Sequence, residues 1–169
     1  MQKRLLAPAA TGRSAMYRKA FPYGACTVLK AWYNVRMKIV VIDGQGGKIG
    51  RIIVEQILSE ALPCELFVVG TNAVATEQML KGGATNAATG ENPVVVLSRD
   101  ADFIIGPIGI VLADSMLGEI TPVIAHAVSA SHAHKILIPV NKCVTISGVQ
   151  DLPMKEYIKL AVDKLKESL

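Results

Sequence analysis

The stretch KIVVIDGQGGKIG at residues 38–50 decides the fold. Four β-branched apolar residues lead into Asp43, and four glycines then fall within seven positions. An apolar pattern with the period of an α-helix begins behind them. This order predicts a β-strand at 38–43, a glycine-rich turn and the start of a helix. Free N–H groups at a helix start point toward an anion, so we interpret the turn as a seat for a phosphate.

The apolar residues that follow predict the next element. Ile49, Ile52, Ile53, Ile57 and Leu58 recur at spacings of three and four, which places them on one face of a helix that Pro63 ends. Further strands are predicted at 65–69, 84–88, 102–106 and 135–140, and further helices at 73–81, 94–97, 121–131 and 153–167. The valines at 94–96 also suit a strand, but a crossover is needed before 102, and this favours a helix.

Strands therefore alternate with helices along the chain. Such an order predicts a parallel sheet covered by helices on both faces. Right-handed crossovers leave few topologies. We expect an α/β, three-layer Rossmann-like sandwich whose five-stranded, mostly parallel sheet has the order 3-2-1-4-5. The length of 169 residues fits one such domain.

The first 36 residues differ in composition from the rest. They hold seven basic residues and no acid, whereas residues 37–169 hold 11 basic and 14 acidic residues. Three interpretations compete: an organellar transit peptide, a basic disordered tail, or a segment outside the natural protein, whose translation would then start at Met37. We favour the third, with 1–36 as a basic N-terminal extension and 37–169 as a single nucleotide-binding domain.

Composition excludes several classes of function. The net charge of +4 comes from residues 1–36, so it does not indicate nucleic-acid binding by the domain. No apolar run approaches the ~18 residues of a membrane span. The three cysteines are odd in number and widely separated, which fits neither a disulfide framework nor a structural zinc site and favours a reducing cytoplasm.

The predicted strand ends share one property. In an open parallel sheet, ligands bind beyond the carboxyl ends of the strands, near the point where the strand order reverses. Every carboxyl end here is rich in glycine, polar residues or both, while the amino ends are plainer. The candidate binding residues are Asp43, Gly44, Gln45, Gly46, Gly47, Lys48 and Ile49; Gly70, Thr71 and Asn72; Thr89, Gly90, Glu91 and Asn92; Gly106, Pro107, Ile108 and Gly109; and Asn141 and Lys142.

The spacing in the glycine turn leaves the ligand open. It reads Gly44-x-Gly46-x-x-x-Gly50, which is longer than the commonest dinucleotide fingerprint. The second strand ends in Gly70-Thr71-Asn72, where an acid usually binds a ribose hydroxyl. NAD, NADP, a mononucleotide or another phosphate ester all remain candidates, and a tight turn without a ligand is the alternative.

These motifs together resemble a known family. They are MKIVVIDGQGGKIG at 37–50, GTNAVAT at 70–76, ATGEN at 88–92, GPIGIV at 106–111, LGEITP at 117–122 and IPVNKC at 138–143. The set resembles the bacterial family catalogued as domain of unknown function 3842, over residues 37–165. The resemblance implies a Rossmann-like fold and no particular activity. Lys48 stands where the family often has another glycine, which places a positive charge beside the predicted seat.

Four residues are candidates for chemistry. Asp114 and Glu119 follow the fourth strand and could act as general acid or base if that segment folds over the site. Lys142 could neutralise an anion, and Cys143 could act as a nucleophile. Each also has a structural interpretation as a cap, a solvated charge or a buried thiol. His126, His132 and His134 are expected at a helix surface and its end, so we predict no metal site.

Two hypotheses of function follow. The first is a protein that binds a nucleotide, an NAD(P)-like dinucleotide or another small phosphate-bearing ligand at Gly44–Gly50; if it is an enzyme, an NAD(P)-type oxidoreductase is the first candidate. The second is a metabolite-sensing or scaffold protein of the same fold without catalysis, favoured by the absence of a recognisable catalytic set. A domain of this size can also complete a site across a homodimer. We expect no nucleic-acid or membrane partner.

Overall fold

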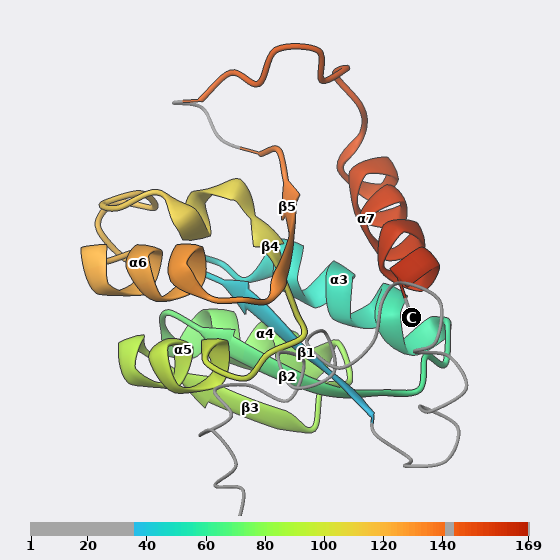
Figure 1. Cartoon of the computed structure of the whole chain (residues 1–169), viewed down its shortest axis with the longest axis horizontal. Helices are drawn as coiled ribbons and strands as arrows, with labels where there is room; N and C mark the ends of the chain where they lie inside the picture. The colour runs from blue at the N-terminus through green and yellow to red at the C-terminus, as the bar shows by residue number, and fades with distance from the viewer. Residues whose placement is uncertain (1–35, 141–143, 169) are drawn as a thin grey trace, which may run out of the picture.

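The computed structural model describes residues 36–140 and 144–168. In this part of the chain, strands and helices alternate as the sequence predicts (Figure 1). The strands are β1 (Met37–Asp43), β2 (Cys64–Gly70), β3 (Asn86–Thr89), β4 (Phe103–Pro107) and β5 (His134–Ile138). The helices are α3 (Lys48–Ser59), α4 (Ala73–Lys81), α5 (Glu91–Ser98), the 3-10 helix η1 (Ile108–Val111), α6 (Pro122–Ala130) and α7 (Met154–Ser168).

The five strands form one parallel sheet in the order β3-β2-β1-β4-β5. The predicted α/β class and strand order are confirmed. The order reverses at β1, which pairs with β2 on one side and β4 on the other. The register sets Asp43 opposite Gly70, so the glycine turn after β1 and the loop after β2 leave the same edge of the sheet.

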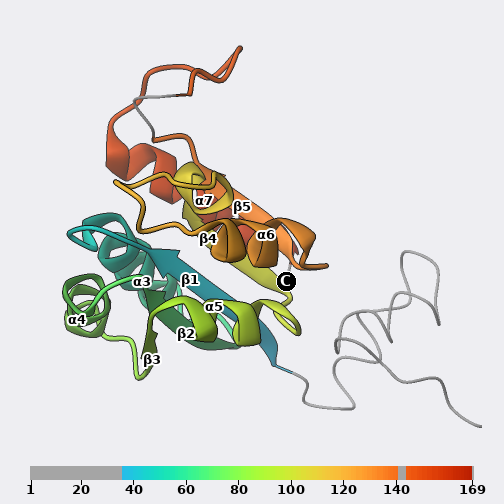
Figure 2. The same ribbon diagram turned by 90° about the vertical axis from the view of Figure 1, so that its left-hand side faces the viewer.

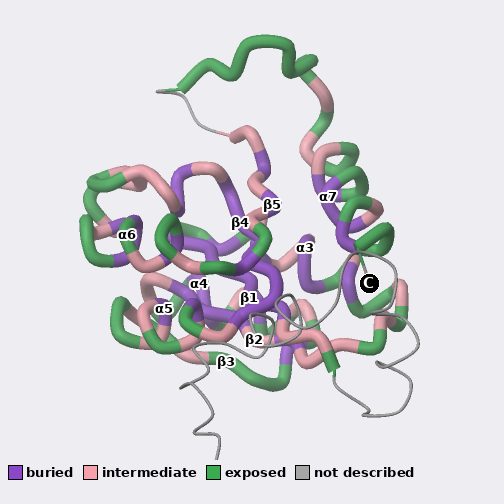
Figure 3. Tube along the Cα trace, in the orientation of Figure 1, coloured by how far each residue is buried: buried purple, intermediate pink, exposed green. Residues whose placement is uncertain are grey.

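Helices cover both faces of the sheet (Figure 2). Alternate residues of β1 point to opposite faces, so Ile39 and Val41 join the core under α3, α4 and α7, while Val40 and Ile42 join the core under α5 and α6. All four side chains are fully buried, and β1 lies at the centre of the buried trace in Figure 3. Burial on both faces explains why β1 reads as a continuous apolar run.

Three local predictions need correction. Helix α3 ends at Ser59 rather than at Pro63, because Ala61 takes a positive φ of 47° and its N–H bonds to the carbonyl of Leu58 at 3.1 Å. Leu58 is 45% exposed, so the apolar face of α3 stops at Ile57. Strand β3 spans 86–89 rather than 84–88; Ala84 instead packs in the core below α4.

The helix predicted at 94–97 is confirmed by α5, which begins at Glu91. The helix predicted at 153–167 is confirmed by α7, which buries Ile158, Ala161, Val162 and Leu165. Among the described residues, no helix combines the length and the apolar character needed to cross a membrane.

Candidate ligand site at the carboxyl edge of the sheet

The glycine turn is built around a buried carboxylate. Asp43 ends β1 with 3% of its surface exposed. Its Oδ1 accepts the N–H of Gly44 at 2.8 Å, and its Oδ2 accepts the N–H of Gly50 at 2.7 Å. The side chain therefore ties the end of the strand to the first turn of α3. Burial raises the pKa of Asp43 above its ordinary value, the charge of Glu119 raises it further, and the backbone hydrogen bonds oppose both.

Two glycines in the turn meet steric requirements. Gly47 is the N-cap of α3 with a φ of +64°, and a Cβ there would lie 2.5 Å from the Cα of Ala75. Gly44 lies under other side chains: its Cβ would lie 2.7 Å from the sulfur of Met116 and 2.9 Å from Oε2 of Glu119. Glycine at these positions lets α4 and the segment after β4 approach the turn closely.

Glu119 is the centre of a second set of hydrogen bonds. Its Oε2 accepts the backbone N–H of Gln45 at 2.8 Å, the amide of Asn72 at 2.9 Å and the hydroxyl of Thr71. These three donors come from the glycine turn and from the end of β2. Burial raises the pKa of Glu119, but the three hydrogen bonds outweigh it and hold the pKa below its ordinary value. The carboxylate is therefore ionised at neutral pH.

Asn72 joins this set to the neighbouring helix. Its side-chain oxygen accepts the N–H of Ala75 at 2.8 Å and so caps the N-terminus of α4. Its side-chain nitrogen donates to Oε2 of Glu119 and also to the carbonyl oxygen of Gln45 at 3.0 Å. One asparagine thus fixes the glycine turn, α4 and Glu119 relative to one another.

The segment that carries Glu119 folds over the glycine turn. It follows η1, and Asp114, Met116 and Leu117 adopt left-handed φ angles of 62°, 55° and 60°. These angles are unfavourable for residues with a side chain. Met116 lies against Gly44 and Gly109, while Leu117 is 98% exposed at the tip. The hydroxyl of Ser115 donates to the carbonyl of Gly109 at 2.6 Å, which anchors the segment to η1.

Several N–H groups of the predicted phosphate seat are already in use. Those of Gly44 and Gly50 bond to Asp43, that of Gln45 bonds to Glu119, and that of Gly47 bonds to the carbonyl of Gly44 at 2.9 Å. Within the described residues, the N–H groups of Gly46 and Lys48 have no acceptor. Both residues are exposed, and the ammonium of Lys48 belongs to the same turn. Ile49 is partly buried behind them.

The other strand ends contribute less to this cluster. Thr89 shares a hydrogen bond of 2.7 Å with Thr76, and the N–H of Gly90 bonds to the carbonyl of Gly70 at 2.8 Å. Glu91 accepts the hydroxyl of Thr121, which caps α6, so it joins the starts of α5 and α6. The structure thus gives Glu91 a partner outside the cluster around Glu119.

The remaining candidates divide into three groups. Gly106, Pro107 and Gly109 are buried, and a Cβ on Gly106 would lie 2.3 Å from the carbonyl oxygen of Ile42, so Gly106 serves strand packing. Ile108 is partly buried, and Asn92 is exposed. Asp114 is exposed, and its backbone N–H bonds to the carbonyl of Ile120 at 2.7 Å. Asn141, Lys142 and Cys143 lie outside the described residues.

The histidines play no common part in the described structure. The ring of His134 packs edge-on against Phe103, with the centroids 5.9 Å apart. His126 and His132 are exposed. In the part of the chain that the structure describes, no three His, Cys, Asp or Glu residues are arranged to hold a metal ion.

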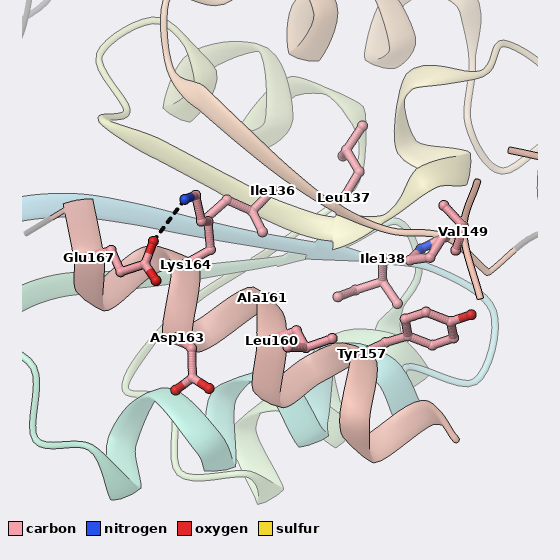
Figure 4. A pocket seen from close by; sticks show the side chains of 11 residues that line it. Ile136, Leu137, Ile138, Val149, Tyr157, Leu160, Ala161, Asp163, Lys164 and Glu167 are labelled. Atoms are coloured by element: carbon pink, nitrogen blue, oxygen red, sulfur yellow. Dashed lines mark hydrogen bonds and ion pairs between the residues drawn. The ribbon is translucent and has the colours of Figure 1, made fainter. Parts of the chain in front are cut away.

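A groove of about 590 Å³ lies beside β5 and includes none of the residues of the glycine turn. It runs between β5 and α7 and is lined mainly by apolar side chains, including Ile138, Val149 and Leu160 (Figure 4). Its charged residues lie toward the end of α7, where Lys164 and Glu167 pair with each other at 2.8 Å. The groove contains none of the candidate residues. Met116 and Glu119 lie over Gly44 in the glycine turn.

Sequence reasoning identified Glu119 only as a candidate acid or base and did not identify Met116 or Thr121. The contact between Met116 and Gly44 depends on left-handed backbone angles that the residue types at 114–117 do not indicate. The Thr121–Glu91 pair had a partial signal, because Thr121-Pro122 is a helix-start signature. No spacing in the sequence indicates that Glu91 reaches it.

Comparison with models of protein families identifies the family of this chain. The family model described as a domain of unknown function, DUF3842, matches residues 38–169. The chain belongs to this family. Comparisons with curated proteins and with solved structures found no match. The resemblance noted in the sequence is thus confirmed, and any function must be argued from this member's own geometry.

Proposed function

We propose that this DUF3842 protein binds a nucleotide, an NAD(P)-like dinucleotide or another small phosphate-bearing ligand at the turn formed by Gly44–Gly50. One observation carries the proposal. The N–H groups of Gly46 and Lys48, which have no acceptor among the described residues, belong to the turn whose Gln45 contacts Asn72 and Glu119 at the point where the strand order reverses. This is where ligands bind in open parallel sheets.

The charge balance of the site limits what can bind. The carboxyl groups of Asp43 and Glu119 already accept hydrogen bonds from several N–H groups of the turn. Their negative charge repels a phosphate. A phosphate would therefore contact the outer part of the turn, at Gly46 and Lys48, where a lysine ammonium offsets the repulsion. The N–H groups of Gly46 and Lys48 can contact the oxygens of a single phosphate group or of one side of a pyrophosphate. The ligand is thus one that gains affinity from contacts beyond its phosphate.

The alternative is a protein of the same fold that senses a metabolite or acts as a scaffold without turnover. The lowered pKa of Glu119 favours this alternative, because a general acid needs a pKa that is raised toward neutrality. An NAD(P)-type oxidoreductase stays the first candidate if the protein is an enzyme. A cytoplasmic location and a homodimer also stay predictions, and sedimentation of the purified chain measures the second.

Thermal unfolding of the full chain tests the proposal. The protein is heated with NAD, NADP, FAD, ATP, GTP or inorganic phosphate, each over a range of concentrations. A ligand at ~100 times its dissociation constant stabilises the folded state by ~2.7 kcal/mol, which raises the melting temperature. The variant Gly46→Val should abolish the shift, because its side chain covers the free N–H groups while meeting no atom within 4 Å of its Cβ.

The matched control is Ala87→Val, which adds the same side chain on the exposed edge strand β3. It should leave the shift unchanged. If no nucleotide or phosphate stabilises the wild type, or if Gly46→Val keeps the full shift, the proposal is wrong.

A further inference from the structure

Glu119 presents one carboxylate oxygen that the protein does not use. All three hydrogen bonds to this side chain end on Oε2. Within the described residues Oε1 has no partner, and it is not among the buried atoms that lack one, so it keeps contact with solvent. The three donors fix the plane of the carboxylate while leaving Oε1 free to accept a hydrogen bond.

This oxygen lies where the fold otherwise lacks an acid. Strand β2 ends in Gly70-Thr71-Asn72, although an acid at this end of the second strand usually binds a ribose hydroxyl. The side chains of Thr71 and Asn72 instead donate hydrogen bonds to Glu119, which comes from the segment after β4. The carboxylate missing from β2 is therefore supplied from another part of the chain.

We infer that Oε1 of Glu119 accepts a hydrogen bond from the free 2′-hydroxyl of a ribose whose phosphate lies at Gly46 and Lys48. The inference rests on the proposed function and narrows it to ligands with an unmodified ribose. A carboxylate accepts from a hydroxyl and repels a phosphate. The site would thus take NAD or a ribonucleotide and would reject NADP or a 2′-deoxynucleotide.

The strength of this preference follows from the charge on the acceptor. A hydrogen bond to a charged group contributes more than one between neutral groups, and leaving a fixed carboxylate unpaired carries a further penalty. The 2′-deoxy ligand should bind at least about tenfold more weakly than its ribose counterpart. The 2′-phosphate of NADP should weaken binding by a similar factor or more, because two negative charges would face each other.

Isothermal titration of the full chain tests the inference with two ligand pairs: ATP with 2′-deoxy-ATP, and NAD with NADP. Changing the ligand leaves the protein untouched, so this comparison does not depend on the folding of a variant. The expected result is weaker binding of the modified member in each pair that binds. Equal affinity within the pairs would overturn the inference while leaving the proposed function in place. Binding by none of the four would remove the inference together with nucleotide binding itself.

The variant Glu119→Gln provides the second arm. Its amide oxygen can still accept the donors that hold Glu119, but it removes the charge, so the penalty for NADP relative to NAD should shrink by about tenfold. Glu77→Gln is the matched control, because it removes one exposed carboxylate that pairs with Lys81 on α4. The control should keep the wild-type ratio. A ratio that stays the same in Glu119→Gln would contradict the role of the charge.

Discussion

The turn after β1 and the segment after β4 both place residues at left-handed backbone angles, but with different residue types. In the turn, Gly47 takes φ +64° without strain, while Gln45 takes φ 47° with a side chain attached. In the second segment, Asp114, Met116 and Leu117 take such angles with side chains attached. Glycine makes the angle at Gly47 inexpensive, whereas contacts must hold the angles at Gln45 and in the second segment. The two loops meet at Gly44, Gln45 and Glu119, so each loop helps to hold the left-handed residues of the other.

The comparison predicts its largest effect at Gly47. Gly47→Ala places a Cβ 2.5 Å from the backbone of α4 at an unfavourable φ. We expect it to lower the free energy of unfolding by about 2–4 kcal/mol, from the backbone strain and the overpacking together. Urea denaturation measures this. Gly46→Ala is the control, because its Cβ would meet nothing within 4 Å, and it should change stability by less than about 0.5 kcal/mol.

An intermediate effect is expected where the two loops are joined. Glu119→Ala removes the acceptor for Gln45, Thr71 and Asn72. The site is partly exposed, so water can replace part of what is lost, and we expect a loss of about 1–2 kcal/mol. Glu119→Gln should cost less, because an amide oxygen remains. Equal stability of wild type and Glu119→Ala in the same denaturation experiment would show that Glu119 does not hold the segment.

A smaller effect of opposite sign is expected at the tip of the strained segment. Leu117 is 98% exposed, so Leu117→Gly removes little packing and relieves the cost of its left-handed φ. The greater entropy of glycine in the unfolded chain offsets part of this gain. We expect stability to rise by up to about 1 kcal/mol. The same substitution at Leu160, which is exposed on α7, should lower stability by a similar amount because glycine disfavours a helix. Parallel losses in both variants would argue against strain at Leu117.

The sequence was sufficient to predict the sheet and its order, because buried parallel strands are apolar throughout and the glycine turn marks the reversal point. It also identified Asp43, Gly44, Thr71, Asn72 and Glu119 as candidates. It could not predict that Glu119 reaches the end of β2. That contact spans 48 residues in the chain and depends on φ angles that Met116 and Leu117 rarely adopt. Local propensity carries no information about such a contact.

The two carboxylates at the junction provide the last and smallest prediction. The pKa of Glu119 lies below its ordinary value of 4.5, and that of Asp43 lies above its ordinary value of 3.8, partly because Glu119 is charged. Glu119→Gln should therefore lower the pKa of Asp43. Carboxyl carbon shifts followed by NMR through an acid titration measure this directly, with Glu77→Gln as the control. An Asp43 pKa that is unchanged in Glu119→Gln would show that the two charges do not interact.

The same shifts determine how each carboxylate affects stability. The contribution of Glu119 is present above its ordinary pKa of 4.5 and is lost as pH falls through its lower folded value. That of Asp43 is fully present below 3.8 and is lost as pH rises through its higher folded value, because burial penalises the ionised form. Acidification thus weakens the hydrogen bonds that Glu119 accepts from the glycine turn. It also removes the penalty for a buried negative charge on Asp43. Of these two carboxylates only Asp43 remains in Glu119→Gln, so the variant should lose less stability than the wild type on acidification, and the contribution of Asp43 should appear at lower pH than in the wild type.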